Sequence, residues 1–210
     1  HQTGVAGIHV DSNTGQNAIT VIRGAPASFT KDEIDINVIK KSKIFLTQLE
    51  IPIDVTLYCL KKAKESGLIN ILNPAPACKL DKEFFSLADY FTPNEAEAEF
   101  YTGVKINNEN DAKESAKKLL ELGLKKVIIT LGEKGLFYSD GKEEIYIKAL
   151  PFKKVEDTTG AGDAFNGGLA YALSKNKNIK ECLNIANQVA GLSTLNLGAG
   201  NSMPLLTDLK

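Results

Sequence analysis

The sequence predicts an α/β fold in which a mostly parallel sheet is covered by helices on both faces. Strands and helices alternate from Ser42 onward, which is typical of parallel sheets. The strand Val127–Thr130 is apolar and β-branched along its length, so it needs cover on both sides. The chain has 210 residues, which suffices for one such domain with a substantial core.

The first residues predict a different local structure. Thr3–Val10 and Ala18–Ile22 flank a polar turn, Asp11–Asn17, and this pattern indicates a β-hairpin. A hairpin does not fit into the parallel layer, so we expect it to project from the sheet. We therefore predict a small β element within residues 1–30 and the α/β domain in residues 31–210.

The other elements follow from apolar periodicity and from breakers such as Gly67, Pro74 and Gly123. The predicted helices span Lys31–Lys41, Asp54–Glu65, Asn94–Tyr101 (capped by Asn94), Glu109–Leu122, Gly162–Leu173 and Ile179–Leu195. The predicted strands are Ile44–Leu46 (expected to be buried), Leu68–Leu72, Asp89–Thr92, Val127–Thr130, and the hairpin pair Leu136–Ser139 and Glu144–Ile147.

Polar clusters follow the strands of this predicted sheet. Ligands bind at the carboxyl ends of the strands in such folds, so we expect these clusters to converge on one edge. They are Gln48–Glu50, Asn73–Ala75, Pro93–Glu97, Thr130–Gly135 and Asp157–Asp163.

Composition excludes several classes of function. The net charge is −1 without a basic block, so nothing points to nucleic acid or an anionic membrane. No apolar run reaches membrane-spanning length, and no signal-peptide pattern opens the chain. The scattered Cys59, Cys78 and Cys182 indicate reduced thiols in a cytoplasmic protein. His1 and His9 are too few for a metal cluster or a histidine-based triad.

The segment Asp157–Gly168 is the most informative part of the chain. Its two carboxylates flank a loop of small residues that opens an apolar helix. Gly160 and Gly162 carry no Cβ, so an anion can approach the free N–H groups of the helix start. Asp163 beside an anion is unfavourable unless chemistry requires it, for instance as a base that accepts a proton. An N-capping Asp on a Gly-rich turn is the alternative explanation.

Residues 157–163 match the pattern Asp-Thr-x-Gly-Ala-Gly-Asp and so resemble the C-terminal signature of the ribokinase-like (PfkB-type) carbohydrate kinases. The resemblance implies phosphorylation of D-ribose at O5 by ATP, with Mg²⁺ and K⁺ as cofactors. It makes Asp163 the base that contacts the sugar hydroxyl. The N–H groups of Gly160, Ala161 and Gly162 would stabilise the charge on the transferred group.

The resemblance also implies a nucleotide site. Asn94 and Glu97 match an Asn-x-x-Glu element that organises Mg²⁺, water and phosphates, although a helix cap explains them locally. Lys134 fits a solvent-exposed turn residue better than a phosphate ligand, and the small residues around Asn187 suit helix packing as well as adenine. The residues assigned to ATP are Asn94, Glu97, Thr130, Gly132, Glu133, Lys134, Gly135, Gly162 and Asn187.

A Gly-rich loop, Leu197–Pro204, follows the last helix. In the family an equivalent loop binds a monovalent cation together with the segment that begins at Asp157; a turn without an ion is the alternative. Gly200-Asn201 departs from the Gln-Pro that the family has there. The residues assigned to K⁺ are Asp157, Thr159, Ser193, Asn196, Gly198 and Ser202.

Two further segments bear on the substrate. Glu50 follows a strand and is suited to accept hydrogen bonds from sugar hydroxyls. Leu46–Glu50 and Asn73–Ala77 are most similar to the ribose-phosphorylating members of the family. A kinase of fructose, a nucleoside or a ketodeoxy sugar acid remains possible, as does a nucleotide-binding module without catalysis.

The resemblance covers essentially all 210 residues but not the family's N-terminal portion, which carries its paired-glycine sugar motif. We therefore expect these residues alone to be inactive. In the family's terms, residues 1–30 belong to a β lid that closes over the sugar and pairs with the lid of a second subunit. Residues 31–210 are then the nucleotide-binding and catalytic domain of a homodimer.

Overall fold

The computed structural model describes residues 1–209 and divides into two compact units. The first unit comprises residues 1–3, 23–132 and 136–146, and the second comprises residues 4–22, 133–135 and those from 147 onward. The predicted boundary after residue 30 divides the chain by function, and it stays a prediction.

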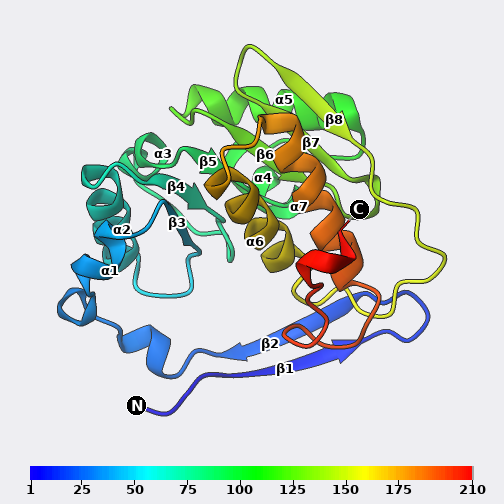
Figure 1. The fold of residues 1–210 in the computed structure, drawn as a ribbon, viewed down its shortest axis with the longest axis horizontal. Coiled ribbons are helices and arrows are strands. Elements are labelled where there is room, and N and C mark those ends of the chain that lie inside the picture. The colour runs from blue at the N-terminus through cyan, green and yellow to red at the C-terminus, as the bar shows by residue number, and fades with distance from the viewer. Residues whose placement is uncertain (210) are drawn as a thin grey trace. The chain divides into compact units, whose positions relative to one another are not determined.

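The first unit is built on a six-stranded sheet with the order β3-β4-β5-β6-β7-β8 (Figure 1). The four strands from β3 to β6 run parallel, and β7 is antiparallel to β6. The predicted mostly parallel sheet is thereby confirmed. Its strands are β3 (Ile44–Thr47), β4 (Ile69–Leu72), β5 (Tyr90–Phe91), β6 (Val127–Thr130), β7 (Leu136–Ser139) and β8 (Glu144–Ile147).

Helices pack on this sheet: α2 contacts β3 and β4, and α5 contacts β6 and β7. Val127, Ile128 and Ile129 have no exposed surface, so both faces of β6 are buried, as the sequence predicts. The helical segments of this unit are η1 (Ala25–Ser28), η2 (Lys31–Glu33), α1 (Ile36–Lys40), α2 (Ile53–Glu65), α3 (Lys82–Leu87), α4 (Glu95–Thr102) and α5 (Glu109–Glu121).

The structure corrects two of the predicted elements and adds a helix. The single helix over Lys31–Lys41 is wrong, because Asp35 is extended and caps α1 after the separate turn η2. The first strand is not buried: β3 is the outer strand of the sheet, and Leu46 is 39% exposed. Helix α3 was not predicted, although it buries Phe84 and Phe85.

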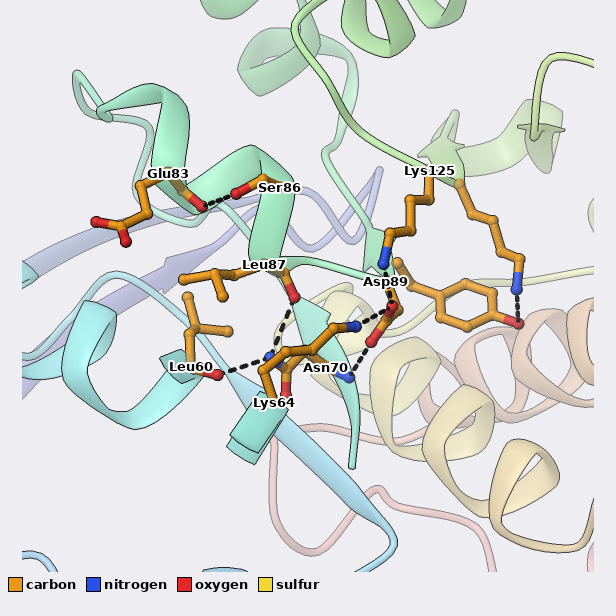
Figure 2. Close-up of polar contacts among 10 residues, drawn as sticks. Leu60, Lys64, Asn70, Glu83, Ser86, Leu87, Asp89 and Lys125 are labelled. Atoms are coloured by element: carbon orange, nitrogen blue, oxygen red, sulfur yellow. Dashed lines mark hydrogen bonds and ion pairs between the residues drawn. The ribbon is translucent and has the colours of Figure 1, made fainter. Parts of the chain in front are cut away.

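A polar cluster joins the amino ends of β4 and β5 to two helices of the first unit (Figure 2). The side-chain nitrogen Nδ2 of Asn70 donates to the carbonyls of Leu60 (2.9 Å) and Leu87 (3.1 Å). The Asp89 carboxylate accepts from Lys64, from Lys125 and from the Asn70 N–H. These contacts link strand starts to helices, so we assign the cluster a structural role.

The second unit holds the hairpin and two long helices. The hairpin is confirmed as a separate two-stranded sheet of β1 (Val5–Val10) and β2 (Asn17–Ile22), in which Val10 pairs with Asn17. Helices α6 (Ala161–Ser174) and α7 (Ile179–Ser193) pack closely. A Cβ on Gly168 would lie 3.0 Å from the Ala186 Cα, so glycine permits this approach.

Three features complete the fold. The remaining helical turns are η3 (Gly132–Lys134) and η4 (Leu206–Asp208). Within residues 1–209, no helix combines the length and the apolar character that crossing a bilayer requires. All three cysteines are free thiols, as the sequence predicts.

Candidate active site

The polar segments that follow the parallel strands of the first unit do gather at one edge of its sheet. The Leu49 N–H donates to the Ala75 carbonyl at 2.9 Å, which joins the segments after β3 and β4. The Thr130 N–H donates to the Pro93 carbonyl at 2.9 Å, which joins the segments after β6 and β5. The predicted convergence is thereby confirmed for these segments. Glu50 lies beside them and is exposed.

Asn94 and Glu97 form a reciprocal capping box at the start of α4. The Glu97 N–H donates to the Asn94 side-chain oxygen, and the Asn94 N–H donates to Glu97 Oε2, both at 2.8 Å. Glu97 is only 8% exposed, and burial raises the pKa of its carboxyl, although the Asn94 N–H lowers it in part. The capping explanation of this pair is therefore correct. The capping bond from the Asn94 N–H uses one of the two carboxylate oxygens of Glu97.

The turn after β6 depends on glycine. Gly132 and Gly135 have φ values of +53° and +107°, and a Cβ on Gly135 would lie 1.9 Å from the Ile147 carbonyl oxygen. Glu133 and Lys134 are exposed between them, as predicted for Lys134. The sequence Gly-x-x-Gly thus reflects a turn that other residues could not form.

The loop Asp157–Asp163 lies in the second unit and leads into α6. Gly160 occupies the N-cap position with φ +76°, and no side chain caps the helix. The Ala161 N–H donates to the Thr158 carbonyl at 3.2 Å, whereas the Gly160 and Gly162 N–H groups have no acceptor within residues 1–209. Asp163 lies exposed in the first helical turn, so a carboxylate and two N–H donors occupy one uncapped helix start.

The Asp157 carboxylate is buried, with 2% of the residue exposed, and it has no ion pair within the described chain. Its two oxygens accept from the Thr159 N–H (2.8 Å) and from the Gly198 N–H (2.9 Å). Burial raises the pKa of this carboxyl, but the bonds from Thr159 and Gly198 outweigh that effect and hold the pKa below its ordinary value. The carboxylate is therefore charged at neutral pH.

The Gly-rich loop after α7 contacts this carboxylate through the Gly198 N–H, so the structure brings these two residues of the predicted K⁺ set together. Ser202 is buried and donates to the Ala199 carbonyl, whereas Asn196 is exposed. Ser193 donates to the Ala190 carbonyl. The sequence missed Thr194, whose carbonyl accepts from the Glu156 and Asp157 N–H groups at 2.9 and 3.3 Å. No local signal could have found this contact, because it joins the loop to the end of a distant helix.

Asn187 has a structural contact in addition to its predicted role. Its amide nitrogen donates to the Lys148 carbonyl at 2.9 Å, and four residues later Gly191 packs against the Phe152 ring. Both contacts attach the connection after β8 to α7. The expected proximity to adenine stays a prediction.

Two groups of predicted residues therefore exist. Asn94, Glu97 and Thr130 belong to the first unit, and the Asp157–Asp163 loop with its partners belongs to the second.

Comparison with known proteins decides the family. The model of the pfkB family carbohydrate kinases matches residues 1–206. The chain belongs to this family. One relative is the bifunctional ribokinase/ribose-5-phosphate isomerase A of Fructilactobacillus sanfranciscensis, which is 40% identical to the present chain. The match covers 97% of the present chain and 38% of that protein. The ribokinase of Staphylococcus aureus is 36% identical over 99% of the chain and 69% of its own length.

Solved structures give the same fold. The Arabidopsis thaliana ribokinase, solved in complex with ribose and ATP, superposes with a TM-score of 0.87 at 31% identity. The match covers 96% of the present chain and 66% of that one. The ribokinase-like α/β fold predicted from the sequence is thereby confirmed.

Proposed function

We propose that this pfkB chain carries the nucleotide site and catalytic base of a ribokinase, which transfers the γ-phosphoryl group of ATP to O5 of D-ribose. The products are ribose 5-phosphate and ADP. Support comes from the family and from ribokinases among its relatives, of which the chain spans between 38% and 69%. The observation that carries the proposal is the uncapped start of α6, where exposed Asp163 follows left-handed Gly160.

Asp163 accepts the proton of the sugar O5 hydroxyl in this mechanism. The O5–phosphorus bond forms as the bond from the γ-phosphorus to the leaving ADP oxygen breaks. The Gly160 and Gly162 N–H groups donate to the oxygens of the transferred group, where charge must be stabilised. The Ala161 N–H takes part only if it first releases the Thr158 carbonyl.

Asn94, Glu97, Thr130 and the turn Gly132–Gly135 are proposed to bind ATP, with Asn187 near adenine. Within residues 1–209, no three His, Cys, Asp or Glu side chains gather to hold a metal. Mg²⁺ bound to ATP would depend mainly on phosphate oxygens and water, which suits its chemistry. Glu97 fits this arrangement, because its Oε1 atom is left over from the capping box and can accept from a metal-bound water. The ion would neutralise phosphate charge.

A K⁺ site at Asp157 is proposed on two observations. The buried carboxylate has no cationic partner in the described chain, and the buried Thr159 hydroxyl has no hydrogen-bond partner there. Both oxygens are hard ligands suited to such an ion, and the remaining ligands proposed from the sequence are oxygens of Ser193, Asn196, Gly198 and Ser202. A bound cation would balance the charge beside the helix start.

Activity should then be higher in KCl than in NaCl of equal ionic strength.

The hairpin is proposed to act as the lid over the sugar and as the contact between two subunits. Its apolar side chains are exposed, including Val5 (65%), Val21 (57%) and Ile22 (70%). A second copy of the hairpin would cover such residues.

Glu50 as a sugar ligand and a cytoplasmic location also remain proposals.

The test measures phosphorylation by the natural full-length protein with D-ribose, D-fructose, adenosine and a ketodeoxy sugar acid as acceptors. Ribose should give the highest kcat/KM. Asp163→Asn should lower kcat at least ~100-fold, the lower range for losing a general base, while the KM for ATP changes little. Asp54→Asn, in the exposed first turn of α2, serves as the matched control. Near-normal kcat in Asp163→Asn would refute the assignment of the base.

A further inference from the structure

The turn of the hairpin is attached to the loop that carries the proposed base, and one residue makes the attachment. Thr158 donates both its N–H (2.9 Å) and its hydroxyl (3.0 Å) to the Gly15 carbonyl. Its hydroxyl oxygen also accepts from the Asn17 amide nitrogen at 3.0 Å. Three hydrogen bonds thus join residues separated by more than 140 positions in the sequence.

Hydrogen bonds within the turn hold the hairpin side of this junction. The Asp11 side chain accepts from the Asn13 and Thr14 N–H groups at 2.8 and 3.1 Å, and the Gly15 N–H donates to the Asp11 carbonyl at 2.8 Å. Gly15 is buried with φ +70°, and a Cβ there would lie 2.9 Å from the Val155 side chain. The Gly15 carbonyl is therefore held at a fixed point beside the loop.

The loop side leads directly to the proposed chemistry. The Thr158 carbonyl accepts from the Ala161 N–H, which sets the first turn of α6. The neighbours of Thr158 are Asp157 and Thr159, which form the proposed cation site. Movement of Thr158 would therefore displace the N–H donors of Gly160 and Gly162 and the carboxylate of Asp163.

We propose that Thr158 is a positioning residue, which fixes the loop Asp157–Asp163 for phosphoryl transfer through its hydrogen bonds to Gly15 and Asn17 of the hairpin. The inference rests on the proposed function. Thr158 acts through the loop and needs no contact with either substrate. Its loss should lower kcat while leaving the KM values for ATP and sugar nearly unchanged.

The test uses the natural full-length protein with Thr158→Val, which removes the hydroxyl but keeps the shape and the N–H bond to Gly15. We expect kcat to fall between about 10- and 100-fold, as for a small misplacement of reacting groups, with both KM values within about twofold. Thr158→Ser should restore at least half of the wild-type kcat. The matched control is Thr207→Val, at an exposed position of η4 whose hydroxyl makes no hydrogen bond in residues 1–209.

A second readout does not depend on turnover. Hydrogen exchange of the amides of residues 160–164 should be faster in Thr158→Val than in the wild type and in Thr207→Val. If the wild type phosphorylates none of the sugars, the proposed function fails, while the exchange rates still decide the role of Thr158. Unchanged kcat or exchange in Thr158→Val, or no rescue by Ser, overturns the proposal. Should Thr158→Val not fold, Asn17→Ala takes its place, and unchanged kcat and exchange there overturn it equally.

Discussion

Helices α4 and α7 begin with the same sequence pattern, Asn-x-x-Glu, and with the same hydrogen bonds. In α7 the Glu181 N–H donates to the Asn178 side chain (3.0 Å), and the Asn178 N–H donates to Glu181 Oε2 (3.2 Å), as Asn94 and Glu97 do in α4. The two pairs differ in location. Glu97 is buried beside the carboxyl ends of the parallel strands. Glu181 is exposed, and α7 does not directly follow a strand in the sequence.

This difference shows that the pattern by itself specifies a helix cap. What distinguishes Glu97 is the sheet edge on which the cap is placed, where loops from several strands supply further polar groups. Helix α6 differs from both, because its N-cap residue is the left-handed Gly160 and no side chain caps its first N–H groups. A cap and an anion site are alternative uses of the same donors.

The largest difference between the two capping pairs should appear in kcat/KM for Mg·ATP when their glutamates are replaced. Glu97→Gln keeps a carbonyl that can accept from the Asn94 N–H but loses the charge beside the proposed metal-bound water. We expect kcat/KM for Mg·ATP to fall about 10- to 100-fold, the usual range for residues that orient metal ligands. Glu181→Gln, with identical chemistry on α7, should change it less than twofold. Equal effects in steady-state assays of both variants would remove the functional distinction between the pairs.

The uncapped start of α6 can be tested by restoring a side chain. Gly160→Ala places a Cβ at φ +76°, about 3.1 Å from Ala199 Cβ and 3.2 Å from Met203 Cε. The left-handed conformation costs roughly 1–2 kcal/mol for a residue with a Cβ, so the free energy of unfolding should fall by at least that amount. Gly167→Ala in the same helix has open space around its Cβ and should increase stability by up to about 1 kcal/mol. Urea unfolding of both variants measures the contrast, and equal stabilities would contradict it.

Much of the fold follows from local patterns in the sequence. Runs of three apolar or aromatic residues, followed by Thr130 and Ser139, predict β6 and β7, and Asn94 and Gly103 bound α4 as the capping rules require. The misassigned Lys31–Lys41 segment contains Asp35, which has a strong preference for N-cap positions and so interrupts the helix. The outer position of β3 is not visible in its sequence, because an apolar strand has the same composition at an edge as in the interior.

Individual residues of the candidate site could be proposed from the sequence, but the contacts among them could not. The Asp157–Asp163 pattern was recognisable as a loop before a helix, and the structure has that loop. The bond from the Gly198 N–H to Asp157 spans 41 residues, and the bonds from Thr158 to Gly15 span 143. Such pairings arise from how the chain is packed, and no periodicity or capping rule records them.

The asparagines of the two capping boxes should be equivalent for stability. Both are exposed N-cap residues, so Asn94→Ala and Asn178→Ala should each lower the free energy of unfolding by about 1 kcal/mol. Only Asn94→Ala should also raise the KM for Mg·ATP, because it loosens a helix start at the proposed nucleotide site. Thermal unfolding and steady-state kinetics of the two variants test this, and a raised KM in Asn178→Ala would contradict it.

The smallest effect concerns pH and compares Glu97 with Asp89. Hydrogen bonds from Asn70, Lys64 and Lys125 outweigh the burial of Asp89 and hold its pKa below the ordinary 3.8, so its stabilising contribution is lost as pH falls through the folded pKa. Burial raises the pKa of Glu97 above 4.5, so the folded state binds the proton more tightly and Glu97 favours folding as pH falls.

The two substitutions should therefore alter acid stability in opposite directions. Asp89→Asn should reduce the loss of Tm between pH 6 and pH 3.5, whereas Glu97→Gln should increase it, since each removes one of two opposing proton linkages. Glu181→Gln, at the exposed start of α7, serves as the control for removing a capping carboxylate. The measurement is Tm across this pH range for the three variants. A change of the same sign for Asp89→Asn and Glu97→Gln would show that burial of Glu97 is not what sets it apart from the exposed cap of α7.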